Sequence, residues 1–234
     1  MYTVLHFKSL NSTNSYAKAR AADIADRTVV SADTQTAGRG RMTRIWKSEE
    51  GGLYFSLFLK PSCTDHLANV TQLMALCVCQ VLRADGAETT LKWPNDVLCQ
   101  KEKICGILSE VILRNNKIHA LVVGVGINVS QQDLSDVGQP ATSLVQQGIN
   151  VNKQELLQVI LNRFFEKYDR LLTDGFSSIR KEYISHFPYI EKQVNIQNGS
   201  SHTQGIVKGF SNEGELLLES RGSLHNILIG DMRI

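Results

Sequence analysis

"EVILRNNKIHALVVG", residues 110–124, is the stretch that decides the fold class. Asn115 and Asn116 separate two runs of β-branched and apolar residues, and asparagines are favoured in the tight turns that join antiparallel strands. The stretch therefore predicts a β-hairpin within a mixed, mostly antiparallel sheet. The runs expected to form strands of this sheet are 27–33, 52–59, 89–93, 103–113 and 117–130.

Helical segments are expected between and after these strands. Ser12 or Thr13 can cap the first helix, and Asn152 stands three residues before Glu155 at the start of the third. Helices packed on a mostly antiparallel sheet form an α+β domain, which we expect to span residues 1–188. The four segments are 11–25, 65–86, 152–175 and 176–187.

The character of the chain changes after Pro188. Short strand-like runs recur every eight to twelve residues, with turn signals such as Asn198-Gly199 and Arg221-Gly222 between them. No helical pattern interrupts these runs. Residues 189–234 therefore predict a small β-barrel or β-meander packed against the larger domain.

The composition is that of an ordinary soluble globule. The 234 residues are 42% hydrophobic and 21% charged, with a formal net charge of +2. A near-neutral chain without a basic bias does not favour nucleic acid as a partner. No apolar run is expected to cross a membrane, so we predict a cytoplasmic protein with no membrane contact. The five cysteines lack paired metal-ligand spacing and are expected to be buried, reduced thiols.

The stretch "QTAGRGRMTRIW", residues 35–46, concentrates arginines in a glycine-containing loop. Gly38 and Gly40 would free the backbone, so that Arg39 and Arg41 could turn toward one anion. Guanidinium groups bind phosphates and carboxylates with paired hydrogen bonds. The loop is either a clamp for an anion or a solvated basic loop.

The stretch "LKWPNDVL", residues 91–98, predicts a strand that breaks at Pro94. Asn95 and Asp96 then lie side by side at the strand end. Their oxygens could hold Mg²⁺ together with substrate phosphates, or they could simply cap a turn.

Two further stretches combine glycines with polar residues at strand ends. In "KEKICGILSE", residues 101–110, Lys103 could neutralise developing negative charge, or it could be an ordinary surface lysine. Gly106 inside this strand suggests close approach of a ligand. "VVGVGINVS", residues 122–130, leads to Asn128 and lacks the third glycine of a dinucleotide fingerprint.

The order of these stretches, preceded by "STN" at 12–14, resembles the biotin–protein ligase family. "QTAGRGR", "KWPNDVL", "KICGIL" and "GVGIN" carry the resemblance, and "GIVKGFSNEGELLLE" is similar to the family's C-terminal domain. The resemblance implies a class II synthetase-like biotin–lipoate ligase core with a small SH3-like β-barrel. It also implies ATP-dependent activation of biotin to biotinyl-5′-AMP and pyrophosphate, followed by transfer of biotin to a lysine. That lysine belongs to a biotin carboxyl carrier domain of acetyl-CoA carboxylase or a related carboxylase.

The same resemblance assigns roles to residues at matching positions. Arg39, Lys103 and Arg41 are the expected electrostatic catalysts, and Mg²⁺ is the expected cofactor, with no tightly bound prosthetic group. Asn95 and Asp96 would hold Mg²⁺ with the substrate phosphates. The residues expected at biotin are Ser12, Thr13, Asn14, Gln35, Arg39, Gly40, Arg41, Lys103 and Gly106. Those expected at ATP or the adenylate are Arg41, Arg44, Trp46, Lys92, Asn95 and Asn128.

The chain departs from the family pattern in three places. Met42-Thr43 stands where relatives often have Arg-Gly, which suggests a stiffer loop. Residues 130–144 lack the aromatic that some members place over adenine, and "GDM" near the C-terminus replaces a common Gly-Glu. The changes at 42–43 and in 130–144 are expected to affect how well the adenylate is retained.

Three further features are DNA binding, the chemistry of the site and the oligomeric state. The first motif begins at Ser12, which suggests a short form without the N-terminal DNA-binding domain of some relatives, and hence no DNA partner. A lipoate or octanoate ligase, or a non-catalytic binding protein on the same fold, are the alternatives in function. An exposed strand edge could also pair two copies, so a homodimer remains open.

Overall fold

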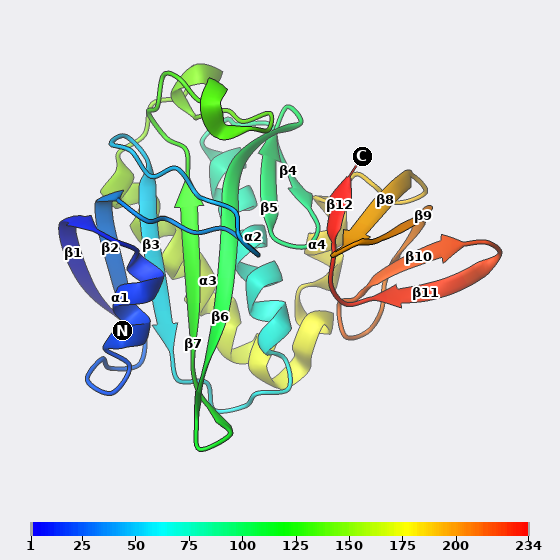
Figure 1. Ribbon diagram of the computed structural model, residues 1–234, viewed down its shortest axis with the longest axis horizontal. Coiled ribbons are helices and arrows are strands. Elements are labelled where there is room, and N and C mark those ends of the chain that lie inside the picture. The colour runs from blue at the N-terminus through cyan, green and yellow to red at the C-terminus, as the bar shows by residue number, and fades with distance from the viewer. Residues whose placement is uncertain (1, 234) are drawn as a thin grey trace.

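The computed structural model describes residues 2–233, which form a seven-stranded sheet beside a smaller five-stranded one (Figure 1). The large sheet has the strand order β1-β2-β3-β7-β6-β5-β4. Only β1 and β2 run parallel, and every other neighbouring pair is antiparallel. The strands are β1 (Thr3–Leu10), β2 (Thr28–Gln35), β3 (Leu53–Leu59), β4 (Thr89–Lys92), β5 (Asp96–Cys99), β6 (Glu102–Arg114) and β7 (Lys117–Ile127). The expected mixed, mostly antiparallel sheet is confirmed.

The hairpin of β6 and β7 forms the centre of the sheet, as its sequence predicts. Asn115 and Asn116 both have positive φ angles, 50° and 57°, which is the backbone of a two-residue hairpin turn. Strand β7 pairs on its other side with β3, which is buried along its whole length. Two strands were not predicted from the sequence: the edge strand β1 and the four-residue strand β5.

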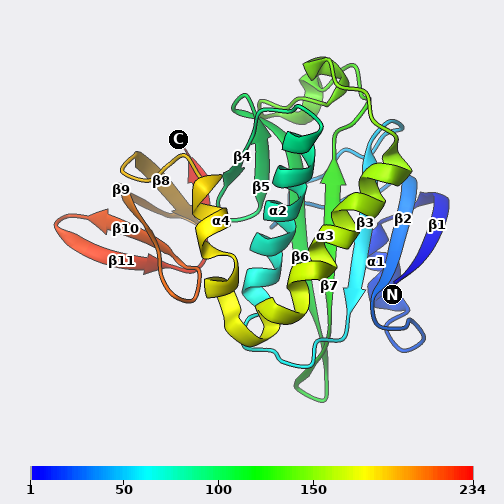
Figure 2. The same cartoon turned by 180° about the vertical axis from the view of Figure 1, so that it is seen from behind.

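Helices cover the two faces of the large sheet unequally. Figure 2 shows α2 (Leu67–Ala84) and α3 (Lys153–Asp174) lying side by side on one face, whereas α1 (Thr13–Ala19) lies on the other. Asn152 caps α3 by accepting hydrogen bonds from the backbone of Gln154 and Glu155. Helix α1 is much shorter than the expected segment 11–25, so most of its face of the sheet stays available for a cavity.

The burial of α2 explains its composition. It is apolar and long enough to cross a membrane by length and composition alone, with a mean hydropathy of 1.4, but 72% of it is buried inside the protein. Its Cys77 and Cys79 are buried free thiols, and burial raises the pKa of Cys77 to about 12. All five cysteines are free, as expected, and four are buried, whereas Cys63 is partly exposed.

The C-terminal sheet packs on the end of the helical layer. It has the order β11-β10-β9-β8-β12 and is antiparallel throughout. Phe210 contacts the rings of Phe176, Tyr183 and Phe187 around α4 (Arg180–Ser185), and one hydrophobic core runs through both sheets. The division into 1–188 and 189–234 therefore remains a prediction about independent folding. The strands are β8 (Gln193–Asn198), β9 (Ser201–Phe210), β10 (Leu216–Ser220), β11 (Ser223–Ile227) and β12 (Asp231–Arg233).

Candidate active site

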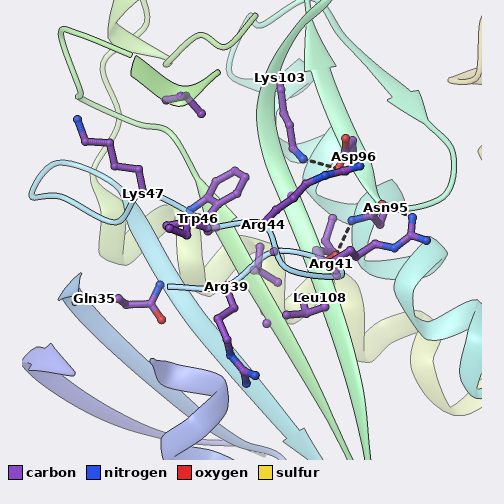
Figure 3. A pocket seen from close by; sticks show the side chains of 18 of the residues that line it. Gln35, Arg39, Arg41, Arg44, Trp46, Lys47, Asn95, Asp96, Lys103 and Leu108 are labelled. Atoms are coloured by element: carbon purple, nitrogen blue, oxygen red, sulfur yellow. Dashed lines mark hydrogen bonds and ion pairs between the residues drawn. The ribbon is translucent and has the colours of Figure 1, made fainter. Parts of the chain in front are cut away.

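A cavity of about 630 Å³ brings most of the predicted site residues together. It lies on the face of the large sheet that carries α1, beneath the loop between β2 and β3 (Figure 3). The predicted residues that line it are Ser12, Thr13, Asn14, Gln35, Arg39, Gly40, Arg41, Arg44, Trp46, Asn95, Asp96, Lys103 and Gly106. Segments separated by up to ninety-odd residues therefore meet in one place.

Two predicted residues lie outside this cavity. Lys92 lines a larger neighbouring cleft toward the C-terminal sheet, where burial lowers the pKa of its ammonium group. Asn128 is buried, and its amide donates to the backbone carbonyl of Thr142 at 3.0 Å. Asn128 thereby supports the loop beside the cavity, close to Trp46 and Lys103, and its contact with the nucleotide remains a prediction.

Neutral hydrogen-bonding groups line one end of the cavity, at the start of α1. The backbone N and the hydroxyl of Thr13 both donate to Gln35 Oε1, at 2.8 and 3.1 Å. Gln35 Nε2 in turn donates to Ser48 Oγ at 2.8 Å. Ser12 caps α1 through a bond from the backbone N of Ser15. These connected amides and hydroxyls can recognise a polar, uncharged group.

The glycines of β6 and β7 make room for side chains of the site itself. A Cβ atom at Gly124 would clash with the amide of Asn14, and one at Gly126 or Gly106 would clash with the indole of Trp46. The sequence suggested that Gly106 admits a ligand to the strand. The closest neighbour of that position is instead the indole of Trp46, which also lies against Gly126.

Trp46 and Lys103 form the middle of the cavity. The Lys103 ammonium group lies 5.4 Å from the centre of the Trp46 ring, over its face. Trp46 Nε1 is buried and has no hydrogen-bond partner among residues 2–233, so it is a free donor within the cavity. The backbone of Lys103 is fixed by a bond from its N to Pro140 O at 3.0 Å.

A mostly buried pair of opposite charges lies at the other end of the cavity (Figure 3). Lys103 Nζ is 2.8 Å from Asp96 Oδ1, and the two side chains are only 13% and 15% exposed. The two groups form an ion pair but are not aligned for a hydrogen bond. Asp96 Oδ1 therefore has no hydrogen-bond partner in the described part of the chain. The Lys103 ammonium group can therefore bind an anion, and the Asp96 oxygen can accept a hydrogen bond or bind a cation.

The donor set fits Mg²⁺ in part. Asp96 offers an oxygen, but Asn95 uses both ends of its amide: Nδ2 donates to Ile107 O at 2.7 Å, and Oδ1 accepts from Arg41 at 3.2 Å. Residues 2–233 contain no group of three or more His, Cys, Asp or Glu suited to a metal. A magnesium ion here would take Asp96 plus substrate phosphates and water, the usual arrangement for this ion. The role of Asn95 as a metal ligand remains a prediction, because its Oδ1 already accepts from Arg41.

The arginine loop is more ordered than its glycines suggested. Trp46 N donates to Gly38 O and Gly40 N to Arg44 O, at 3.0 and 2.8 Å. Gly38 does not adopt a positive φ; it is needed because a Cβ would clash with the backbone of Trp46. Met42 has a φ of 57°, whereas Thr43, which replaces the family's glycine, does not have a positive φ. The backbone at Thr43 therefore does not require a glycine, and a stiffer loop remains a prediction.

The three arginines of the loop divide between two acids, Glu110 and Asp231. Arg39 points away from Lys103 and contacts Glu110 and Ser15 (Figure 3). Arg41 donates to Gly230 O at 3.1 Å and to Asp231 Oδ1 at 3.2 Å, and Arg44 also pairs with Asp231. Arg39 and Arg41 therefore contact separate acids in this structure, and their joint contact with one anion remains a prediction.

Glu110 and Asp231 hold the arginine loop from outside the cavity lining, and the sequence motifs assign no role to either residue. Both are acids that pair with arginines of the loop, and both lie within stretches singled out for other residues. The available signal was charge balance, because a cluster of arginines in a nearly neutral chain needs acidic partners. Asp231, in the "GDM" sequence, joins the C-terminal sheet to the loop.

Replacing Asp231 by asparagine should loosen the arginine loop. The change removes the carboxylate shared by Arg41 and Arg44, and we expect a stability loss of only about 1 kcal/mol because Arg44 is half exposed. Trypsin should then cleave faster after the arginines at 39–44, as mapped by mass spectrometry. Asp169→Asn, which removes the exposed partner of Arg27, is the control. Equal cleavage of the loop in both variants would contradict a tether through Asp231.

Comparison with known proteins identifies the family of this chain. Residues 6–128 match the biotin/lipoate A/B protein ligase family. The bifunctional ligase/repressor BirA of Bacillus spizizenii is 36% identical over 88% of this chain, and the chain spans 66% of that protein's length. The biotin–[acetyl-CoA-carboxylase] ligase of Paracoccus denitrificans is 29% identical over 89% of this chain and 90% of its own.

A solved structure agrees along the whole chain. The biotin protein ligase of Aquifex aeolicus, in complex with biotin and ATP, has a TM-score of 0.88 and 30% identity, covering 100% of this chain and 98% of that one. The expected class of fold, with its small C-terminal β domain, is thereby confirmed. The chain therefore belongs to the biotin/lipoate A/B protein ligase family, as an ATP-dependent ligase of the biotin–protein ligase type.

Proposed function

We propose that this enzyme activates biotin with ATP and transfers it to a lysine of a carrier domain. The acceptor would be the biotin carboxyl carrier domain of acetyl-CoA carboxylase or a related carboxylase. One observation carries the proposal: a single cavity has neutral hydrogen-bonding groups at one end and the Lys103–Asp96 pair at the other. Biotin has this same polarity, with a neutral ureido ring at one end and a carboxylate at the other.

The neutral end favours biotin over lipoate. The ureido group has both N–H donors and a carbonyl acceptor, which match the mixed donors and acceptors of Asn14, Thr13 and Gln35. The dithiolane ring of lipoate has no N–H or carbonyl group and would form none of these hydrogen bonds, and a site built for hydrogen bonds disfavours analogues that lack them. The network therefore supports biotin as the acid that is activated.

In the first half-reaction, a carboxylate oxygen of biotin attacks the α-phosphorus of ATP. An oxygen–phosphorus bond forms, and the bond from that phosphorus to the bridging oxygen breaks, so that its electron pair leaves with pyrophosphate. Two anions must approach each other, and the Lys103 ammonium group would offset their repulsion in a site shielded from water. A magnesium ion, held by Asp96 and the phosphates, would neutralise charge on the leaving group.

In the second half-reaction, the neutral amine of the acceptor lysine attacks the carbonyl carbon of biotinyl-5′-AMP. A carbon–nitrogen bond forms, the bond from that carbon to the phosphate oxygen breaks, and AMP leaves with the electron pair. The amine proton is lost to solvent or to a base. No residue of this chain acts as a covalent nucleophile, so its side chains bind, orient and shield the adenylate.

The test is biotinylation of a purified carrier domain with ATP and Mg²⁺. We expect one biotin on each carrier and none on a carrier whose acceptor lysine is replaced by arginine. Lipoate is included as a competing acid, and it should neither be transferred nor reduce the transfer of biotin. Transfer of lipoate in preference to biotin, or binding of biotin without any transfer, would overturn the proposed function.

A further inference from the structure

Glu110 is a partly buried carboxylate beside the cavity that the reaction described above does not use. It lies in the middle of β6, opposite Val122 of β7, and its side chain is 19% exposed. Burial alone would raise its pKa, but hydrogen bonds from Lys18 and Asn14, with the charges of Lys18 and Arg39, bring the pKa below the usual value of a glutamate. Glu110 is therefore an anion at neutral pH.

Three side chains share this carboxylate. Lys18 Nζ is 2.7 Å from Oε1, and Asn14 Nδ2 is 2.8 Å from Oε2. Arg39 reaches it with only one nitrogen, at 3.2 Å from Oε2 and 3.4 Å from Oε1. The contact of Arg39 is thus the longest of the three, and its side chain is 47% exposed.

Glu110 also fixes the orientation of Asn14. The amide nitrogen of Asn14 faces two groups that only accept hydrogen bonds, the Glu110 carboxylate and Leu108 O at 3.2 Å. The amide oxygen must therefore face the other way, where it accepts from Ser56 Oγ at 2.5 Å. A glutamine at position 110 would still offer an oxygen to Asn14, so the charge of Glu110 can be removed without reversing this amide.

The position of Arg39 defines a competition. Its guanidinium group points toward Glu110 and away from Lys103 and Asp96 in Figure 3. If the adenylate phosphate binds near Lys103, as proposed above, Arg39 must leave Glu110 to contact it. Lys18 and Asn14 stay on Glu110 when Arg39 leaves, so the carboxylate is not left buried without a partner.

We propose that Glu110 is a positioning residue that competes with the anionic adenylate for Arg39, and that Lys18 sets the strength of this competition. The inference rests on the proposed function, because it needs an anionic ligand that Arg39 contacts. Removing the carboxylate charge releases Arg39 and tightens ligand binding. Removing Lys18 leaves Arg39 as the main cation on Glu110, strengthens their contact and weakens ligand binding.

The expected size of the effect follows from the weakness of an exposed ion pair. Such a pair favours its bound form by a factor of about one to five. A ligand that binds only the released form has its affinity reduced by the released fraction. Glu110→Gln should therefore tighten binding of biotinyl-5′-AMP by about two- to fivefold, and Lys18→Met should weaken it by about two- to threefold.

The experiment measures the Kd of biotinyl-5′-AMP for the full chain by tryptophan fluorescence, since Trp46 lines the cavity. Glu110→Gln and Lys18→Met should shift the Kd in opposite directions, and both shifts should vanish when Arg39 is alanine. Biotin amide, which carries no anion, should bind all variants equally. Glu182→Gln is the matched control, because Glu182 also accepts from a lysine and an amide, Lys167 and Gln80, on the helical side.

The outcomes separate this inference from the proposed function. Shifts of the same sign, shifts that persist without Arg39, or equal shifts for biotin amide would show that Glu110 acts only on structure and would overturn the competition. An unchanged Kd in both variants would overturn it as well. If the unaltered chain forms no biotinyl-5′-AMP from biotin and ATP, the proposed function itself fails.

Discussion

Replacing Lys103 by alanine is expected to slow formation of biotinyl-5′-AMP by about 30- to 1000-fold. The range corresponds to about 2–4 kcal/mol, the usual cost of removing one preorganised group that stabilises charge in a transition state. Lys103 is suited to this role because it is nearly buried beside Asp96, over the face of Trp46, and its backbone is anchored at Pro140. A charge held in such a place does not have to reorganise when two anions meet.

Single-turnover measurement of pyrophosphate release tests this expectation. Alanine at position 103 leaves Asp96 without its cation, so Lys103→Gln serves as a second variant that keeps a hydrogen-bond donor without the charge. Both should be slow while retaining a cooperative thermal transition. Lys117→Ala, an exposed lysine at the far end of the same hairpin, should keep the full rate. A normal rate in the folded Lys103 variants would show that another group supplies the charge.

Replacing Arg39 by alanine should let the adenylate escape about 10- to 150-fold faster. A hydrogen bond to a charged group contributes about 1.5–3 kcal/mol, and Arg39 is the loop arginine that is not tied to the C-terminal sheet. Stability should change little, because the side chain is half exposed and its contact with Glu110 is long. Arg39 is therefore expected to act on the ligand rather than on the fold.

The release rate can be followed by filtration of enzyme carrying labelled biotinyl-5′-AMP. Arg39→Lys keeps the charge but loses the paired donors, so it should give an intermediate rate. Arg170→Ala, which removes an exposed arginine of α3, is the control. Retention of the adenylate by Arg39→Ala at the rate of the unaltered enzyme would rule out the clamp.

Much of this architecture could be predicted because local patterns coincide with tertiary structure. The apolar runs on either side of Asn115 and Asn116 favour a hairpin, and the cap at Asn152 marks the start of α3. Strand β1 was missed because it is a half-exposed edge strand, whose short apolar signal is diluted by polar residues. Helix α1 was overextended because an alanine-rich segment favours helix by composition, although it ends at Ala19.

The sequence predicted which residues line the site, but not which atoms they contact. Motifs identified the lining residues, yet they could not show which neighbour each side chain selects. Gly106 makes room for the indole of Trp46, and Asn95 is held by Arg41 and Ile107. Asp231 is about 190 residues from Arg41 in the chain, and only the packing of the C-terminal sheet brings the two together. Such long-range pairings leave no local pattern in a single sequence.

The central claim is that this cavity joins biotin to the α-phosphate of ATP, with Lys103 as its main source of positive charge. The most direct measurement is exchange of labelled pyrophosphate into ATP in the absence of any carrier protein. We predict exchange that requires biotin, is not supported by lipoate, and falls by about 30- to 1000-fold in Lys103→Gln. Exchange that proceeds without biotin, that prefers lipoate, or that is unaffected by the loss of the Lys103 charge would contradict the account.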